Sequence, residues 1–335
     1  MSRLVIDSIG PASSVQDAGR HGAQRYGLPP SGAMDLLSLA VANTLLGNAP
    51  FAAAIEIGPL GASVTAQDGA VRVAIAGAAR AVELAGQPVI MPRSVMLKPG
   101  ESLKLGAARG GVFSYLAIEG GIVGEPSFGS LAVHARAGLG SPYPRPLQSG
   151  DSIAAPDALP RAELTLNWPP APEAPIRVVL GPQHDEFGDA VAVLLGSEWT
   201  VSAASDRMGY RLEGPTLTHQ HGHNIVSDGT VNGSIQVPGN GQPIVLMPDR
   251  GTTGGYPKIA TVISADLGRL AQIPPGCKFR FEAVEIATAQ QHYRAMMRLI
   301  RALPGQLQQA RTTAFDLEAL HHANVAGIAV SALDD

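Results

Sequence analysis

The stretch PIVLMPDRGTTGGYPKIAT, residues 243–261, places a short apolar run directly before a turn-forming segment. The run PIVLM, residues 243–247, is bounded by glycine and proline and has the length of a strand. The Gly254-Gly255 pair after it favours a tight turn, and a second strand-like run begins near Lys258. The stretch therefore predicts two strands joined by a polar loop.

This polar loop admits two interpretations. The backbone N–H groups of the glycine pair and the hydroxyls of Thr252, Thr253 and Tyr256 can bind a carboxylate or phosphate, with Arg250 or Lys258 as counter-charge. The alternative is a turn with a structural role only. The loop does not match the P-loop pattern, because no Gly-Lys-Ser/Thr follows the first glycine at the required distance. A Walker-type ATP site is therefore not predicted.

Strand-like runs of the same kind recur along the chain. Examples are RVAIAG at 72–77, FSYLAIEG at 113–120 and IRVVLG at 176–181, each ending in glycine. The 39 glycines and 27 prolines show no period or low complexity, which is typical of many short strands joined by tight turns. The sequence thus predicts a mainly β protein with a few helices, built as barrels or sandwiches rather than alternating βαβ units.

Two segments predict helices of useful length. Residues 32–47, GAMDLLSLAVANTLLG, are apolar on nearly every side, which indicates a buried helix covering one barrel, with Ser31 as a possible N-cap and Asp35 in the first turn. Residues 286–303 form an amphipathic pattern with arginines on the polar face. Shorter candidates lie at 184–195 and 262–272.

The chain of 335 residues is long enough for two domains, each with its own core. A proline-rich stretch near the middle marks the boundary between them. We therefore expect an N-terminal β domain over residues 1–160, a linker over 161–175, a second β domain over 176–285, and a C-terminal helix and tail over 286–335.

Charge and cysteine content narrow the class of protein. The net charge is −4, and the 24 lysines and arginines are scattered, so no basic surface for nucleic acid is predicted. Cys277 is the only cysteine, which excludes an internal disulfide and a CxxC metal or redox site. We see no signal peptide or membrane span and expect a cytoplasmic protein.

Three histidines, His219, His221 and His223, are spaced so that on a strand all of them would face one side. Zinc sites use histidine pairs at this spacing, but the sequence favours a solvated cluster at a strand edge, because no carboxylate partner follows from it. We therefore predict no metal site.

Two further loops carry charged residues that either form turn-stabilising ion pairs or line a pocket. One contains Asp206 and Arg207. The other, near the first strand, contains Asp17 and Arg20.

Taken together, these loops resemble those of the allophanate hydrolase subunit 2 family. That family includes the KipA proteins, which are associated with the C subunit of the prokaryotic 5-oxoprolinase, and the related part of the urea carboxylase carboxyltransferase domain. The resemblance runs over nearly the whole chain. It is carried by residues 15–48, 114–121, 205–214, 233–276 and 323–333, and the stretch 233–276 is the most specific. Cys277 departs from the pattern, because the family more usually has aspartate at this turn.

The resemblance implies two cyclophilin-like β-barrel domains that work beside a KipI-like subunit (allophanate hydrolase subunit 1) and a LamB/YcsF-like subunit. The implied reaction is the ATP-dependent opening of 5-oxo-L-proline to L-glutamate, with ATP bound at the level of the complex. One alternative is a component of a biotin-dependent carboxyltransferase, although this chain has no biotinyl attachment motif. Another is a non-enzymatic KipA-like antagonist that binds a KipI-like kinase inhibitor.

The same resemblance implies Asp249, Tyr256 and Lys258 as catalytic residues. In the oxoprolinase reaction ATP would phosphorylate the lactam oxygen, and N–H donors with a cation would stabilise the resulting charge. We expect the site residues of both domains to converge on one carbonyl or phosphoryl oxygen. The substrate- or anion-binding residues implied are Asp228, Gln236, Arg250, Thr252, Thr253, Gly254, Gly255, Asp206 and Arg207, and from the first domain Asp17, Arg20, Ser31, Met34, Asp35 and Asn43.

Overall fold

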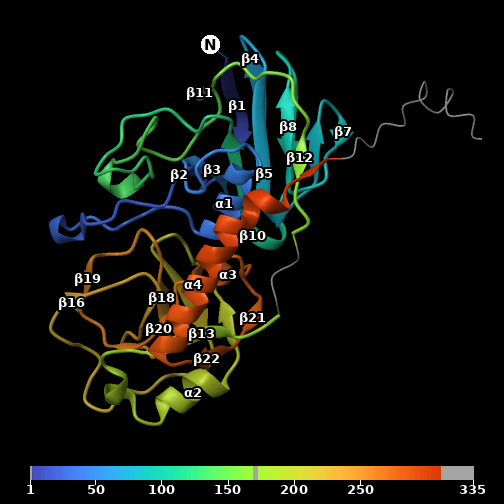
Figure 1. Ribbon diagram of the computed structural model, residues 1–335. Helices are drawn as coiled ribbons and strands as arrows, with labels where there is room; N and C mark the ends of the chain where they lie inside the picture. The colour runs from blue at the N-terminus through green and yellow to red at the C-terminus, as the bar shows by residue number, and fades with distance from the viewer. Residues whose placement is uncertain (1, 169–172, 311–335) are drawn as a thin grey trace, which may run out of the picture.

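The computed structural model describes residues 2–168 and 173–310, which form a mainly β molecule with two halves (Figure 1). In this view the first half lies above the second, and one long helix, α4 (Ile286–Ala302), runs across both. The predicted mainly β class with a few helices is confirmed. Among the described residues no helix is long and apolar enough to cross a membrane.

Two sheets build the first half. Alternate residues of a strand point to opposite faces, so the buried residues of both sheets meet in one core that includes Leu4, Val64 and Leu116. The six-stranded sheet has the order β11 (Ser152–Ala154), β1 (Arg3–Ile9), β4 (Ala62–Gln67), β9 (Ser102–Leu105), β6 (Val82–Leu84), β7 (Gln87–Pro88). The seven-stranded sheet has the order β2 (Ser14–Gln16), β3 (Ala54–Ile57), β10 (Arg109–Ile118), β5 (Val71–Ala79), β8 (Arg93–Leu97), β12 (Leu164–Thr165), β23 (Gln308–Gln309).

Strand β5 is covered on both faces. Val73 and Ile75 point into the core between the two sheets, whereas Ala74 and Ala76 belong to a second core that contains helix α1 (Leu36–Thr44). Because alanine side chains are short, the helix lies close to the strand. The facing surfaces of the helix and of the strand are therefore both excluded from water. This explains why the helix is apolar on nearly every side.

The second half is a single curled sheet. Its order is β21 (Lys278–Phe279), β14 (Trp199–Val201), β15 (Gly209–Glu213), β18 (Ile244–Leu246), β17 (Ser234–Gln236), β20 (Lys258–Val262), β13 (Ile176–Leu180), β22 (Phe281–Ala283). The two edge strands, β21 and β22, are separated in the chain by Arg280 alone. Since consecutive strands form opposite edges, the sheet closes almost completely into a barrel.

The remaining elements of the described chain are short. A two-stranded ribbon pairs β16 (Asp228–Gly229) with β19 (Thr253–Gly254). The short helices are α2 (Ala190–Gly196) and α3 (Leu267–Ala271), and single 3-10 turns span Gln24–Tyr26, Ala135–Ala137, His184–Phe187 and Leu303–Gln306.

The start of α1 differs from the prediction. Asp35, not Ser31, is the N-cap, because its carboxylate Oδ1 accepts hydrogen bonds from the backbone N–H groups of Leu37 at 3.1 Å and Ser38 at 3.2 Å. These bonds satisfy two of the free donors at the helix N-terminus. Ser31 lies four residues earlier, in a left-handed backbone conformation with φ of 53°.

Two strands tie the ends of the second half to the first. Strand β12 lies within the segment expected to be a linker, and it pairs with β8. Strand β23 lies in the expected C-terminal tail and pairs with β12, so the chain returns to the first half after α4. The predicted domain boundaries remain a prediction, and the tail beyond residue 310 lies outside the described residues.

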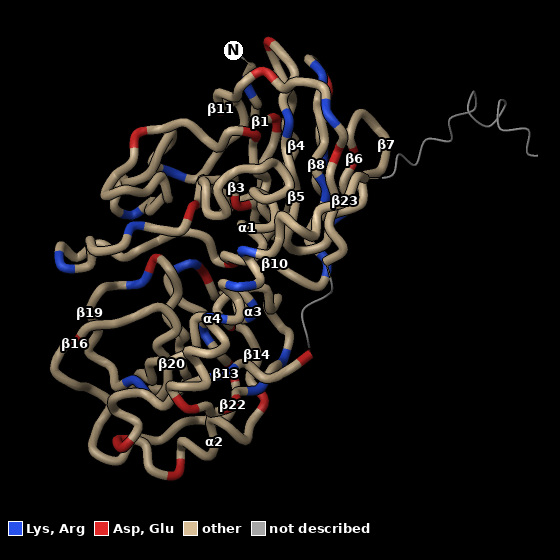
Figure 2. The backbone as a smooth tube through the Cα atoms, in the orientation of Figure 1, with Lys and Arg blue, Asp and Glu red and all other residues tan. Residues whose placement is uncertain are grey.

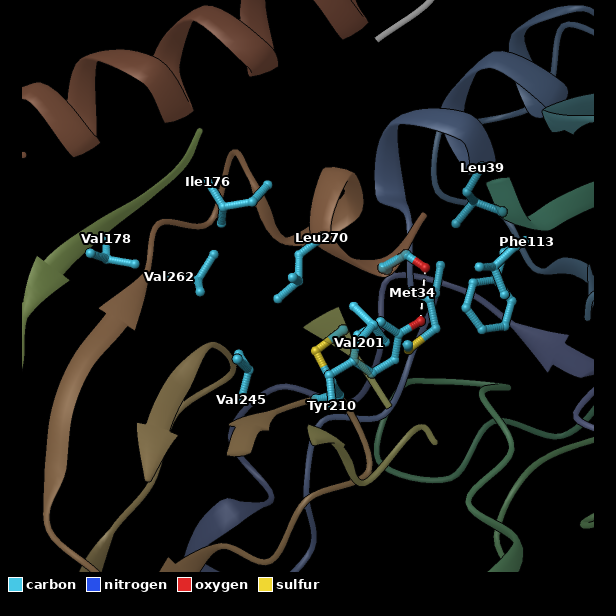
Figure 3. Packing of buried hydrophobic residues seen from close by; sticks show 14 of the residues in the cluster. Met34, Leu39, Phe113, Ile176, Val178, Val201, Tyr210, Val245, Val262 and Leu270 are labelled. Carbon is cyan, nitrogen blue, oxygen red and sulfur yellow. Dashed lines mark hydrogen bonds between the residues drawn. The ribbon is translucent and has the colours of Figure 1, made fainter. Parts of the chain in front are cut away.

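The hydrophobic core continues from one half into the other. Met34 and Phe113 of the first half belong to the same buried cluster as Tyr210, Val245 and Leu270 of the second (Figure 3). Burial of this shared apolar surface favours a fixed arrangement of the halves.

A buried ion pair in the second half contacts helix α4 through its arginine. Arg177 of β13 donates from Nη2 to Asp266 Oδ1 at 2.6 Å and from Nε to Asp266 Oδ2 at 2.8 Å, and its Nη1 contacts the ring of His292 on α4. Asp266 is fully buried. Burial acts to raise the pKa of Asp266, but the hydrogen bonds from Arg177 outweigh it, so the pKa lies below its usual value.

Replacing Asp266 by asparagine should lower the free energy of unfolding at neutral pH by about 1.5–3 kcal/mol, because charge-assisted bonds to Arg177 are lost. A carboxylate whose folded pKa is depressed stabilises the fold above its unfolded pKa, near 3.8, and loses that contribution as pH falls through the folded value. In urea unfolding at several pH values, wild type and Asp266→Asn should therefore converge in acid. A difference that stays constant from neutral pH to about pH 2 would contradict this linkage.

Candidate functional site

Arg207 makes polar contacts between the two halves. Its Nη1 donates to Glu56 Oε1 at 2.5 Å, its Nη2 to the Gly32 carbonyl at 2.7 Å, and its Nε to Asp249 Oδ2 at 2.9 Å. Glu56 and Gly32 belong to the first half, whereas Asp249 belongs to the second. Charged residues of both signs lie along this seam (Figure 2). One guanidinium thus bridges two carboxylates from different halves.

Glu56 lies on β3 with its side chain fully buried. Its Oε2 accepts hydrogen bonds from the Met34 backbone at 2.8 Å and from the Tyr115 hydroxyl at 2.7 Å, and that hydroxyl accepts from the Asp35 backbone at 2.8 Å. Burial raises the pKa of Glu56, while the Arg207 charge and these bonds oppose the rise. Met34 and Asp35 therefore contact Glu56 and Tyr115 through their backbone N–H groups.

Arg20 supplies a second buried cation near the same pair. Its side chain donates from Nη2 to the Ala132 carbonyl, and within the described residues Nε and Nη1 have no hydrogen-bond partner. Burial lowers the pKa of Arg20, whereas the charges of Asp17 and Asp249 raise it and that of Arg207 lowers it. The predicted residues Arg20, Arg207 and Asp249 are thus brought within electrostatic reach of one another.

Asp17 and Asp206 stabilise loops rather than a cavity. Asp17 accepts from the Ser130 hydroxyl at 2.6 Å and from the Leu131 backbone at 2.7 Å. Asp206 accepts from the backbone N–H of Met208 at 2.8 Å, as in an Asx-turn. These bonds position the neighbouring arginines of the two loops.

Lys258 forms a separate group in the second barrel. Its Nζ donates to Asp228 Oδ2 at 2.8 Å, and its backbone N–H donates to Gln183 Oε1 at 3.1 Å. The Lys258 side chain is 4% exposed, whereas that of Asp228 is 54% exposed. The Lys258 ammonium holds the pKa of Asp228 below its usual value. Gln236 lies beside them and donates to the Tyr256 carbonyl at 3.4 Å.

The Gly254-Gly255 segment is a surface ribbon. Thr253 and Gly254 pair with Gly229 and Asp228, and the side chains of Thr253 and Tyr256 are exposed. A Cβ at Gly254 would lie 2.2 Å from Gln236 Nε2, so a larger residue there would displace the end of the Gln236 side chain. Thr252 contributes its carbonyl to Thr230, and Gly255 contributes its carbonyl to Ile225. The ribbon thus carries Asp228, the carboxylate partner of Lys258.

A cleft of about 1740 Å³ lies between the halves, with α4 along one side. Small-molecule sites commonly measure roughly 300–1000 Å³, so this space exceeds what a small substrate needs. Four predicted residues line it: Ser31, Met34, Asp35 and Arg250. The ion pairs made by Lys258 and Asp249 lie outside its lining within the described chain. The predicted residues therefore form three groups, at the cleft, the seam and the ribbon.

Asn43 joins none of these groups. Its side-chain amide donates to the Ala52 carbonyl at 2.8 Å and its Oδ1 accepts from Asn48 at 3.0 Å, so it fastens the end of α1 to the following loop. Its side chain is completely buried. The structure gives it a structural role.

The three histidines lie on a loop and not on a strand, so the strand spacing does not bring them to one side. His219 packs on Phe187 and hydrogen-bonds the Val237 carbonyl, and His221 points to Glu186. No group of three metal-ligating side chains occurs in the described residues. Cys277 is exposed in the turn before β21, where its backbone takes part in ordinary turn bonds.

Several residues of the seam were not singled out from the sequence. Glu56 pairs with Arg207, and the Tyr115 hydroxyl donates a hydrogen bond to Glu56. Gln272 bridges Asp35 to the Phe113 carbonyl. A lone glutamate inside the apolar run AAAIEI was the available signal, because a buried carboxylate requires a partner. The identity of that partner was not encoded locally.

Comparison with known proteins agrees with this architecture. The chain matches the family described as carboxyltransferase domain, subdomain A and B, over residues 26–283. It is 38% identical over 279 residues to the 5-oxoprolinase C subunit of Haemophilus influenzae, covering 83% of this chain and 90% of that protein. It is 37% identical over 302 residues to the 5-oxoprolinase C subunit of Escherichia coli, covering 87% and 96%.

Among solved structures, the Kluyveromyces lactis urea carboxylase superposes with a TM-score of 0.82 at 26% identity, over 92% of this chain and 30% of that longer one. The present chain thus spans less than a third of the carboxylase. The predicted resemblance is confirmed, including homology to the 5-oxoprolinase C subunits over most of the length. Because the match extends through both halves and the seam that joins them, the chain belongs to the family of carboxyltransferase domains with subdomains A and B.

Proposed function

We propose that this chain is a subunit of an ATP-dependent 5-oxoprolinase complex that opens 5-oxo-L-proline to L-glutamate. The observation that carries the proposal is the similarity to two proteins named as the C subunit of 5-oxoprolinase, across at least 90% of their length. The proposed partners are a KipI-like subunit and a LamB/YcsF-like subunit. Each half is proposed to be a cyclophilin-like barrel, the first over residues 1–160 and the second over residues 176–285, as predicted from the sequence.

The cleft fits an anionic reactant better than a neutral one. The chain lacks a phosphate-binding Gly-Lys-Ser/Thr loop. Arg250, however, lines the cleft as a buried cation whose described partners are all neutral. Arg250 and Ser31 would hold phosphate oxygens of ATP or the carboxylate of the substrate, and bound ATP supplies a phosphoryl group. The chain's own residues bind and orient these groups.

Lys258, Asp249 and Tyr256 have separate roles in this proposal. Lys258 is a nearly buried ammonium that stabilises negative charge on a substrate oxygen. Asp249 orients Arg207 at the seam through two hydrogen bonds. Tyr256 offers an exposed side chain beside the ribbon. Their distribution over two groups favours a reaction that is completed by a partner subunit.

A second candidate is transfer of a carboxyl group from biotin. The family match and the similarity to urea carboxylase favour it. This chain carries no biotinyl attachment motif, so a biotin-bearing partner would be required. A third candidate, a KipA-like antagonist of a KipI-like kinase inhibitor, uses the chain only for binding.

The deciding assay mixes the purified chain with its KipI-like and LamB/YcsF-like partners, 5-oxo-L-proline and ATP. We expect glutamate and ADP to form in equal amounts, and neither to form when this chain is left out. Turnover of a biotinyl substrate without glutamate would instead support the carboxyltransferase. Binding of the KipI-like partner with no turnover of either kind would support the antagonist.

A further inference from the structure

The apolar face of helix α4 is only partly covered. Its apolar residues recur at intervals of three and four, which places them in one stripe along the helix: Ile286, Ala289, Tyr293, Met296 and Ile300. Of the 17 residues of α4, only Ile300 is buried, whereas Ile286 and Tyr293 are 62% and 45% exposed. All of the stripe except Ile300 lines the cleft. The stripe is therefore open toward the cleft along most of its length.

Further apolar side chains line the same cleft. They come from α1, from the residues just before β3 and β8, and from the chain after β12: Leu37, Val41, Phe51, Met91 and Trp168. A helical stripe with this spacing is the surface against which a second apolar segment packs, and exposed apolar surface of this kind marks an interaction site. The cleft volume of about 1740 Å³ leaves room for such a segment beside a small reactant.

The described chain ends beside this cleft. Gln306, just before β23, lines it, and β23 pairs with β12. The Ala310 backbone N–H then donates to the Glu163 carbonyl at 2.8 Å. The 25 residues that follow, 311–335, lie outside the described residues. A chain of this length spans about 37 Å as a helix and about 80 Å when extended, and α4 is about 25 Å long, so this segment can reach the whole stripe.

The sequence of this segment matches the cleft in charge and in apolar content. Residues 311–335, RTTAFDLEALHHANVAGIAVSALDD, contain one arginine against one glutamate and three aspartates, whereas the described lining of the cleft contains five arginines against two aspartates. Two of these arginines, Arg109 and Arg294, are exposed and have no carboxylate partner within residues 2–168 and 173–310. Between its acidic residues the segment is rich in leucine, valine, isoleucine and alanine. An acidic, apolar segment complements a positively charged, apolar cleft.

We propose that residues 311–335 bind in the cleft along the apolar stripe of α4. The binding is intramolecular, so the tether gives the segment an effective concentration on the order of millimolar. Burial of its apolar side chains against the stripe supplies the free energy, and the opposite charges favour this segment over others. A reactant or partner that uses this side of the cleft must then displace the segment. The proposal does not rest on the proposed reaction.

Tryptophan fluorescence gives a direct test, because the two tryptophans of the chain have different surroundings. Trp199 is fully buried in the second half, whereas Trp168 is half-buried and lines the cleft. Quenching by acrylamide, a small neutral molecule, therefore reports on Trp168. In the full chain, Leu320→Asp should lower the ratio of bound to free segment by about tenfold or more, because an apolar side chain loses its burial. Quenching should then be stronger than in wild type.

Each test variant has a matched control. Asn324→Asp adds the same charge to the segment at a polar residue, with almost no change of shape. On α4, Tyr293→Asp should increase quenching of Trp168 as Leu320→Asp does, and it should fold, because Tyr293 is half exposed. Gln291→Asp is its control, since Gln291 is exposed and lies outside the cleft lining within the described chain. Both controls should leave quenching at the wild-type level.

Equal quenching of wild type and Leu320→Asp would overturn the proposal, as would a control variant that acts as strongly as its test variant. Protection of Trp168 that grows with protein concentration, together with a dimer mass in light scattering, would assign the stripe to a second copy and not to this segment. Protection that appears only after the KipI-like subunit is added would assign the stripe to that partner instead. Because no turnover is required, absence of glutamate in the complex assay would reject the proposed function without affecting this result.

Discussion

Replacing Glu56 by alanine is expected to lower the free energy of unfolding by about 3–5 kcal/mol, because it leaves the Arg207 guanidinium buried at the seam with one carboxylate instead of two. The same change removes the acceptor for the Met34 backbone and the Tyr115 hydroxyl. The measurement is urea unfolding at neutral pH, followed by signals from both halves. We expect the halves to lose their common transition, since this cluster joins them.

A double-mutant cycle separates the ion pair from the packing around it. Arg207→Met alone should also destabilise the protein strongly, because Glu56 then stays buried without its cation. The combination of Glu56→Met and Arg207→Met should cost less than the sum of the single changes, by about 1–3 kcal/mol, as expected for residues in direct contact. Additive effects would show that the pair contributes no coupling across the seam.

Replacing Lys258 by alanine is expected to lower kcat of the assembled complex by about 100-fold, a typical loss when one charge-stabilising contact to a transition state is removed. The nearly buried ammonium has Asp228 as its carboxylate partner, and a substrate oxygen near it would gain a strong interaction. The assay is glutamate formation at saturating 5-oxo-L-proline and ATP. Asp249→Ala should lose activity by about tenfold or more.

Controls separate chemistry from stability. Lys278→Ala removes an exposed lysine of the same half and should leave turnover unchanged. Lys258→Gln keeps most of the packing, so a loss of kcat with an unchanged unfolding temperature would support a direct role. If Lys258→Ala and Asp249→Ala both retain wild-type kcat in a complex that still assembles, these residues have only structural roles.

Local patterns predicted the elements of this fold well. The strand-like runs at 72–77, 113–120 and 176–181 lie on β5, β10 and β13. They could be predicted because the signals for a strand, β-branched residues bounded by glycine or proline, lie within a few residues of one another. The amphipathic helix at 286–303 appears as α4. The start of α1 was misplaced because both Ser31 and Asp35 are cap-forming residues, and only the turn geometry selects between them.

The candidate site was predicted less completely. The sequence predicted that Asp249, Arg250 and Lys258 act together in one loop. In the structure, Asp249 pairs with Arg207 and Lys258 pairs with Asp228, whereas Arg250 lines the cleft. Neighbours in a loop can face different directions, and side-chain direction depends on the strands on either side. The residue types were visible, but their partners were not.

The amino-acid sequence by itself determined the mainly β class, the long helices and the family, because each follows from residues close together or from motifs that span the chain. Only the tertiary structure decided that Glu56 meets Arg207, 151 residues away, and that Ser31 and Arg250 share a cleft. The physical reason is that burial of apolar surface brings the two halves together. That arrangement determines which charged side chains are buried beside each other and must therefore pair.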